Sequence, residues 1–322
     1  MPDTSTLNQA DPIAGPIDDI AVVDRAALDG PSDDTIALIR SACRDTGYFC
    51  IDPDARQREC IDAALGRMRD FCALDDRDPR KLAVRQQDGR NGWCPRFHEP
   101  DYQPDTISTL EAYDFGREEV ASPSATWPSV AGFREAAIAC WESFHDTAAR
   151  SLEVLAAAAG LDAGSFARRC NSRELNSMRL LHYAAERPVP DERNVGISAH
   201  TDFECITLLF QDTPGLELRS VDGRWQDAGA SVGRIVVMLD DMLERWTNGH
   251  FSATGHRVRE TEEQRFSIVL FVAVNDEEVV APLQPFVSGD RSARYEPVTQ
   301  AEHLEAEVRR ARKNAERRKG CR

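Results

Sequence analysis

Apolar residues recur at helical spacing in the first half of the chain. Three stretches show this pattern, with polar residues between the apolar ones, at residues 32–45, 54–74 and 132–159. Ser32 stands where a helix N-cap is expected, and Gly47 follows the end of the same stretch. We therefore expect three helices here. Two short apolar runs, 20–23 and 48–51, predict strands beside the first helix.

From residue 176 onward the pattern changes to short β-type runs separated by Gly, Pro, Asn or Asp. These runs are residues 178–183, 205–210, 216–219, 235–239, 256–259 and 265–274. A helical half followed by such strands favours a β-sandwich or barrel supported by helices. The polar turn at residues 260–264, centred near Thr261 and Glu262, predicts that the last two runs form a hairpin in which His256 faces Ser267.

Two segments have a less regular pattern. Residues 82–128 are rich in Gly, Pro and aromatic residues without a clear period, so we expect them to line a pocket. Residues 301–322 predict a helix with a strongly basic end, which is either a solvated helix terminus or an electrostatic docking segment. The expected organisation is a flexible leader (1–15), an N-terminal α/β region with pocket-lining loops (16–130), a helix-supported core forming one unit with it (131–300), and a C-terminal helix and basic tail (301–322).

The acidic composition of the chain limits which partners it can bind. The chain has 322 residues, with 55 acidic and 39 basic ones, and its net charge of −16 disfavours nucleic acid and anionic membranes as partners. No apolar run is long enough to cross a bilayer, and the first residues lack the pattern of a secretory signal. Nine scattered cysteines match neither a disulfide framework nor a zinc-finger spacing. We expect a cytoplasmic protein that is a monomer or weak homodimer.

The candidate chemistry begins in the segment AHTDFECITLLFQD. His200 and Asp202 are two residues apart, so on an extended backbone they point to the same side. Two histidines and one carboxylate form the facial triad of non-haem Fe(II) oxygenases. His256 is the preferred second histidine because it begins a β-type run, whereas His250 lies in a polar turn.

A second group of side chains is suited to a carboxylate. Arg265 and Ser267 share a strand face, and Arg is the side chain best suited to bidentate capture of a carboxylate. The hydroxyl of Tyr183, on the run before the His-x-Asp segment, is a further hydrogen-bond donor. A short dicarboxylate near the metal would fit these groups.

The segments HTDFECITLLFQD, NGHFSATGHRV and RFSIVLF resemble the Fe(II)- and 2-oxoglutarate-dependent dioxygenases of the isopenicillin N synthase-like family. The resemblance implies a double-stranded β-helix (jelly-roll) core with N-terminal and C-terminal helices. It also implies that Fe(II) is the metal and that 2-oxoglutarate and O2 are cosubstrates. By the same resemblance, the catalytic metal ligands are His200, Asp202 and His256. The residues that the resemblance assigns to the distal carboxylate of 2-oxoglutarate are Arg265, Ser267 and Tyr183.

The expected activity is the oxidation of a small-molecule metabolite in natural-product biosynthesis, with release of succinate and CO2. Hydroxylation is the first expectation, and desaturation or cyclisation stay open. One alternative is an iron oxidase or cyclase of the same fold that does not use 2-oxoglutarate. Another is a non-enzymatic ligand-binding protein derived from the barrel, although an intact triad argues against it.

Four residues are candidate substrate contacts. Glu204 follows Asp202 by two residues, and it either meets a cationic group of the substrate or is turned by a local bend toward solvent or an arginine. Arg96 either pairs with a substrate carboxylate or is a surface group. Phe97 and Phe115 either line a cavity or cover the core. One departure from plant members of the family is Leu181, which stands where they have an asparagine two residues before the tyrosine.

Overall fold

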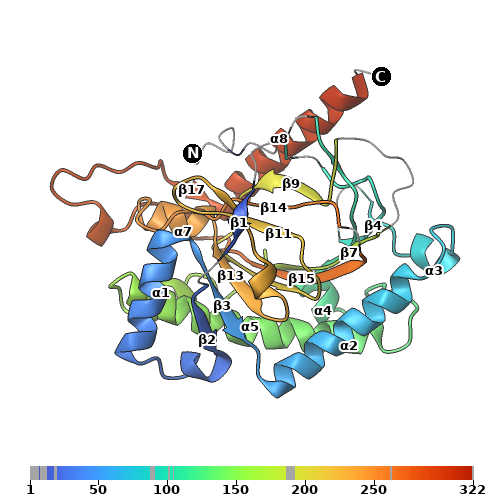
Figure 1. Ribbon diagram of the computed structural model, residues 1–322, viewed down its shortest axis with the longest axis horizontal. Helices are drawn as coiled ribbons and strands as arrows, with labels where there is room; N and C mark the ends of the chain where they lie inside the picture. The colour runs from blue at the N-terminus through green and yellow to red at the C-terminus, as the bar shows by residue number, and fades with distance from the viewer. Residues whose placement is uncertain are drawn as a thin grey trace.

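Two β-sheets packed face to face form the centre of the molecule (Figure 1). The computed structural model describes residues 7, 13–17, 20–87, 91–100, 102–103, 105–185, 193–261 and 263–320. The eight strands of the larger sheet are, in spatial order, β2 (Val22–Asp24), β3 (Tyr48–Asp52), β13 (Ile235–Leu239), β10 (Ile206–Gln211), β15 (Arg265–Val272), β7 (Ser177–Tyr183), β6 (Glu111–Gly116) and β4 (Gly92–Cys94). The five of the smaller sheet are β1 (Ile13–Pro16), β12 (Trp225–Asp227), β11 (Leu216–Arg219), β14 (His256–Val258) and β9 (Ile197–His200).

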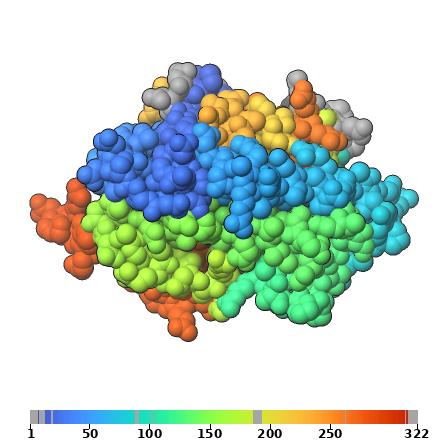
Figure 2. Space-filling model, turned by 90° about the horizontal axis from the view of Figure 1, so that it is seen from below, coloured from blue at the N-terminus to red at the C-terminus, as the bar shows by residue number. Residues whose placement is uncertain are grey.

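The larger sheet separates two apolar cores. On one face, Leu181, Leu209 and Val269 pack against residues of the smaller sheet such as Leu218 and Val258. On the other face lie helices α1 (Asp33–Asp45), α2 (Ala55–Cys72) and α5 (Phe133–Ala158), which cover it as Figure 2 shows from below. Because strand side chains alternate between faces, each strand of the larger sheet contributes to both cores.

The remaining helices and strands are short, except for the C-terminal helix. They are α3 (Pro79–Leu82), α4 (Arg117–Ala121), α6 (Gly164–Ala167), α7 (Asp241–Trp246), α8 (Gln300–Gly320), and two small strand pairs, β5 (Ile107–Ser108) with β8 (Asn194–Val195) and β16 (Val279–Val280) with β17 (Val298–Thr299). None of the helices within the described residues is both long and apolar enough to cross a membrane.

The three expected long helices are confirmed, with ends close to the predicted ones. Ser32 is the N-cap of α1, because its Oγ accepts a hydrogen bond from the Thr35 amide at 3.1 Å. Asp54 caps α2 in the same way, through the Gln57 amide. Such caps satisfy amides that have no partner inside the helix, and each contributes about 1 kcal/mol.

The hairpin predicted between β14 and β15 is wrong. β14 lies in the smaller sheet, where His256 pairs with His200 and Leu218. β15 lies in the larger sheet, where Ser267 pairs with Gln211 and Leu181. The polar turn therefore carries the chain from one sheet to the other, and Glu262 in that turn lies outside the described residues. Both strands are buried except at the partly buried Phe271, so their hydrophobic pattern does not reveal which neighbours they pair with.

Two further expectations need correction. The predicted leader extends to residue 15, but Ile13–Pro16 form β1, which pairs with β12. The segment 82–128 does line a cavity, as expected, through residues such as Glu99, Tyr102 and Asp114. It is not without regular structure, because it contains β4 and β6, which extend the larger sheet beside β7. The basic tail beyond residue 313 and Cys321 lie outside the side chains that the structure describes. The eight described cysteines are free, as expected.

Candidate active site

The two histidines and the aspartate of the predicted triad come together at one edge of the smaller sheet. His200 ends β9 and His256 begins β14, and the two are paired across the strands. Asp202 lies in the turn between β9 and β10 rather than on a continuous strand as expected. The three candidate ligand atoms lie within 4.8 Å of one another, and each side chain is buried. The Nε2 atoms of His200 and His256 are 3.5 and 3.6 Å from Asp202 Oδ1.

Backbone carbonyls set the direction of both imidazoles. The Nδ1 of His200 lies 2.8 Å from the Ser198 carbonyl, and that of His256 lies 3.2 Å from the Thr254 carbonyl. Because a carbonyl only accepts, each Nδ1 carries the proton and each Nε2 turns its lone pair toward Asp202.

The electrostatics of the triad suit a divalent cation. Burial lowers the pKa of His256 to about 4, so its imidazole is neutral and able to bind a metal near pH 7. Burial by itself would raise the pKa of Asp202, but His256 and His200 outweigh this effect and hold it at about 2. The Asp202 Oδ2 atom is buried without a hydrogen-bond partner in the described part of the chain. A cation bound by two imidazoles and this carboxylate would satisfy it.

The predicted carboxylate-binding residues also lie together, on β7 and β15. Arg265 pairs directly with Tyr183 across these strands, and its guanidinium carbon lies 4.6 Å from the centre of the tyrosine ring. Its Nη1 donates to Ser267 Oγ at 3.3 Å. Gln211, which the sequence analysis did not single out, accepts from Arg265 Nη2 at 3.0 Å. Arg265 is fully buried and forms no ion pair among the described residues, so a bound anion would complete its surroundings.

A cavity of about 380 Å³ lies beside these groups. His200, Asp202, His256 and Tyr183 contribute to its lining. Its apolar walls come from both sheets, and the lining residues are Leu181, Ile197, Leu209, Met238, Val258 and Val269. The ring of Tyr102, a residue the sequence analysis missed, stacks on His200 with centroids 4.3 Å apart. The cavity has the size and largely apolar lining of a small-molecule site.

Of the four candidate substrate contacts, only Glu204 lines this cavity. Its side chain is 8% exposed, and its Oε2 accepts from the Phe203 amide at 3.0 Å. Burial, and then the charge of Asp202, raise the pKa of Glu204 to about 8. The alternative that a bend turns Glu204 to solvent or to an arginine is wrong for the described residues, because the side chain is buried and no arginine pairs with it.

The structure places the other three candidates away from the cavity. Arg96 stacks over the ring of Phe97, at 5.3 Å, and donates from Nε to the Thr109 carbonyl. Phe115 is fully buried on the helix side of β6, where its ring packs near Trp127 and Trp141. It covers the core because odd-numbered residues of β6 face the helices, while Asp114 faces the cavity.

A charged group in the cavity wall escaped the sequence analysis. Arg179 on β7 lies directly opposite Asp114 on β6 and donates to it from Nε at 2.8 Å. The two remaining nitrogens of Arg179 bind both carboxylate oxygens of Glu99, at 2.8 and 2.7 Å. Gln86 donates to the second oxygen of Asp114. The sequence held no signal for this group because its members are scattered over residues 86–179.

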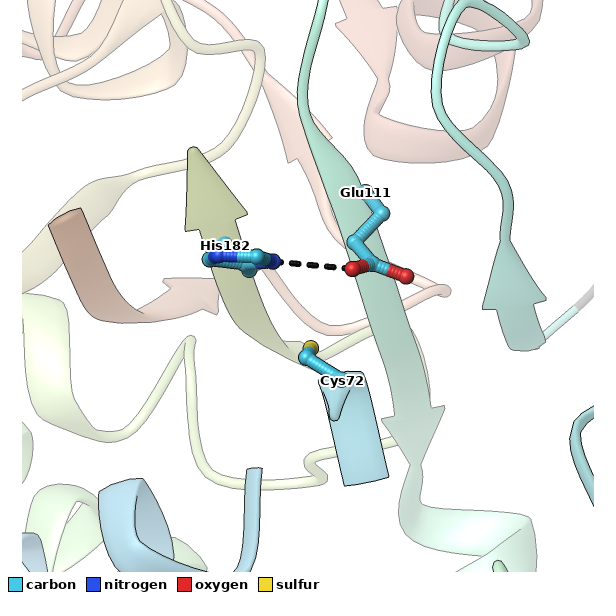
Figure 3. Close-up of side chains that lie close together, drawn as sticks. All are labelled: Cys72, Glu111 and His182. Atoms are coloured by element: carbon cyan, nitrogen blue, oxygen red, sulfur yellow. Dashed lines mark hydrogen bonds and ion pairs between the residues drawn. The ribbon is translucent and has the colours of Figure 1, made fainter. Parts of the chain in front are cut away.

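A second cluster of potential metal ligands, Cys72, Glu111 and His182, lies on the helix side of the larger sheet (Figure 3). Both oxygens of Glu111 are already occupied by donors. His182 Nδ1 lies 2.8 Å from one, and Lys81 Nζ and Trp93 Nε1 lie 3.0 and 2.9 Å from the other. The buried ammonium of Lys81 occupies a Glu111 oxygen that would have to be free to bind a metal. The cluster is therefore a structural charge network.

Comparisons with known proteins identify the family. The sequence profile of the 2OG-Fe(II) oxygenase superfamily matches residues 175–274, which include the triad and the Arg265 group. A profile for the N-terminal region of non-haem dioxygenases in morphine synthesis matches residues 20–131. The chain is a 2-oxoglutarate- and Fe(II)-dependent oxygenase.

Relatives of this oxygenase align along most of its length. The 2-oxoglutarate-Fe(II) type oxidoreductase hxnY of Emericella nidulans is 29% identical over an alignment of 285 positions that covers 82% of this chain and 81% of the relative. The homoarginine-6-hydroxylase 2-ODD-233 of rice is 26% identical over 92% of this chain and 94% of its own. The crystal structure of a full-length Neurospora crassa protein in complex with alpha-KG matches with a TM-score of 0.78, at 23% identity, over 91% of this chain and 96% of that one. This likeness confirms the jelly-roll fold, although the sheets of this oxygenase do not close into a barrel.

Proposed function

We propose that His200, Asp202 and His256 bind Fe(II), and that Arg265, Ser267 and Tyr183 hold the distal carboxylate of 2-oxoglutarate. The observation that carries this proposal is that two buried charged groups in one region each lack one binding partner among the described residues. Asp202 Oδ2 lacks a partner in the described part of the chain, and the buried Arg265 lacks a carboxylate there. A metal ion and a dicarboxylate would satisfy both.

Iron(II) with 2-oxoglutarate and O2 supplies the oxidising chemistry, in which the 2-oxo acid becomes succinate and CO2 and a substrate C–H bond is oxidised. The chain itself positions the reactants. The Ser198 and Thr254 carbonyls hold the imidazoles in one tautomer, in which both Nε2 atoms together with Asp202 would bind the metal. Ser267 and Gln211 orient the guanidinium of Arg265. The apolar walls of the cavity exclude water from the reaction.

The proposed reaction is hydroxylation of a small-molecule metabolite in natural-product biosynthesis, with desaturation or cyclisation as other outcomes. The cavity volume of about 380 Å³ supports a small substrate. Relatives with named substrates include the rice homoarginine-6-hydroxylase and a flavonoid 7-O-demethylase of Ocimum basilicum. Because those substrates differ in size and charge, the relatives support a small organic substrate without selecting one.

We also propose a cytoplasmic monomer or weak homodimer that has neither nucleic acid nor membrane as a partner. The net charge of −16 supports the exclusion of these anionic partners. The eight free cysteines among the described residues are consistent with a reducing compartment.

The decisive experiment is anaerobic addition of Fe(II) and 2-oxoglutarate to the metal-free protein. We expect the visible charge-transfer band of a chelated 2-oxo acid. The band weakens in Arg265→Ala and Arg265→Lys but not in the exposed control Arg77→Ala, with melting curves confirming that each variant is folded. Fe(II) binding without such a band would favour the alternative, an oxidase of the same fold that does not use 2-oxoglutarate. Oxidation of substrate without succinate would establish that alternative.

A further inference from the structure

The charges that line the cavity point to the chemical class of the substrate. We propose that the substrate is a small organic cation, an amine or guanidine protonated at neutral pH, whose nitrogen pairs with the carboxylate of Glu204. This inference rests on the proposed function, because it assigns the substrate of the same iron and 2-oxoglutarate site.

Glu204 is a carboxylate without a cation. It lines the cavity and is 8% exposed, yet in the described residues its carboxyl group accepts hydrogen bonds only from backbone amides, among them that of Phe203. No lysine or arginine in the described part of the chain forms an ion pair with it. Burial without a cationic partner disfavours the charged form of a carboxyl group, and a cation beside it favours that form. A positively charged group entering the cavity would supply this partner.

Arg179 is not available to an anionic substrate. It is the single lysine or arginine among the described residues that line the cavity. All of its donor groups face carboxylates, with Nε on Asp114 and both terminal nitrogens on Glu99. The group of two carboxylates and one guanidinium therefore carries a net negative charge. With Glu204 added, the described substrate walls carry three carboxyl groups and one guanidinium.

The rest of the lining limits the shape of this cation. Leu175, Phe203, and Leu304 and Val308 of α8 add apolar surface to the same cavity. The volume of about 380 Å³ lies near the lower end of the range for small-molecule sites. These features favour an amine or guanidine attached to a compact apolar body. They disfavour an anion, which would meet an acidic wall with no free guanidinium.

The test uses the holoenzyme with Fe(II) and 2-oxoglutarate under anaerobic conditions. The probes are matched sets of alkyl and phenylalkyl compounds that differ only in the end group, which is a primary amine, an alcohol or a carboxylate. Binding is read from the change in the charge-transfer band, and is compared in the wild-type protein, Glu204→Gln, Glu204→Asp and the exposed control Glu153→Gln. The band recorded before the probes are added shows whether the iron and 2-oxoglutarate site itself is intact.

In the wild-type protein and Glu153→Gln, we expect the best amine to bind at least about tenfold more tightly than its alcohol, with the carboxylate weakest. Glu204→Gln removes this preference, and Glu204→Asp restores part of it. Amines that bind no better than their alcohols, including the case in which neither binds, overturn the proposal, as does a preference that survives in Glu204→Gln. Absence of the band in the wild-type protein would instead contradict the proposed function.

Discussion

At the scale of single residues, the direction of each polar side chain decides what the site can bind. The Ser198 and Thr254 carbonyls hold the histidines so that both Nε2 lone pairs face Asp202. Gln211 and Ser267 accept hydrogen bonds from Arg265 and so set the direction of its guanidinium. Short sequence segments contain the metal-binding candidates, but nothing in the sequence relates Gln211 to Arg265, 54 positions away. That relation depends on β10 and β15 being neighbours.

Asp202→Asn tests the metal site at this scale. An amide is a weaker ligand than a carboxylate, so we expect Fe(II) affinity to fall by at least about 100-fold. The metal-free variant should melt somewhat lower than the wild-type protein, because His256 and His200 favour the charged form of Asp202 in the folded state and hold its pKa at about 2. Metal titration and thermal melting of the metal-free proteins measure the two effects. Asp62→Asn, at an exposed position on α2, is the control. Unchanged Fe(II) affinity would exclude Asp202 as a ligand.

Gln211→Ala tests the support of Arg265. The substitution removes the acceptor of two guanidinium nitrogens, so Arg265 loses its fixed orientation. We expect 2-oxoglutarate affinity to fall by about tenfold, while Fe(II) affinity stays unchanged. Isothermal titration with each ligand in turn separates the two quantities. If both affinities fell together, the substitution would have disturbed the fold rather than the orientation of Arg265.

At the scale of elements, side chains along the strands of the larger sheet alternate between the cavity face and the face covered by helices. Cavity-lining residues and residues that support the fold therefore lie on opposite faces. On β7, Arg179, Leu181 and Tyr183 line the cavity, whereas His182 faces the helices and meets Glu111 (Figure 3). The helix boundaries were predictable because caps and periodicity are local properties. The partners of β14 and β15 were not, since both strands are buried on both faces and a polar turn fits a hairpin or a crossing between sheets.

Glu111→Gln tests the charge network that joins α3, β4, β6 and β7. Lys81 is 1% exposed, and Glu111 is its only buried carboxylate partner among the described residues, since Asp76 is exposed. Removing that charge leaves the ammonium poorly compensated, so we expect the free energy of unfolding to fall by about 3 to 5 kcal/mol. Urea denaturation measures it. The double variant Lys81→Met with Glu111→Gln should recover much of the loss, and a double variant less stable than the single one would contradict this account.

At the scale of the whole molecule, the proposed active site lies where two sheets face each other. The triad belongs to the edge of the smaller sheet and the turn after it, while Arg265, Ser267 and Tyr183 belong to the larger sheet. The cavity takes its apolar walls from both. If the proposed residues bind metal and cosubstrate, folding of the two sheets as one unit is a condition for binding both together.

The acid stability of the whole molecule should also reflect the Glu111 network. Burial raises the pKa of Glu111, but His182 and Lys81 outweigh it and lower the pKa from 4.5 to about 2. A carboxylate with a depressed folded-state pKa stabilises the protein above its unfolded pKa, and this contribution is lost as the pH falls toward the folded value. We expect the wild-type free energy of unfolding to fall more steeply between about pH 4.5 and 2 than that of Glu111→Gln. Equal slopes in denaturant titrations over this range would contradict the assignment.

The sequence by itself determined the helices, most strands, the family and the candidate ligands, because periodicity, caps and short motifs are properties of neighbouring residues. Tertiary structure alone decided the sheet to which each strand belongs, the place of Phe115 in the core, and the acidic wall formed by Glu99, Asp114 and Arg179. It also decided that Glu204 is buried in the cavity without a cation among the described residues. These features depend on contacts between distant segments, and the free energy that selects them comes from burial and pairing across the whole molecule rather than from local preference.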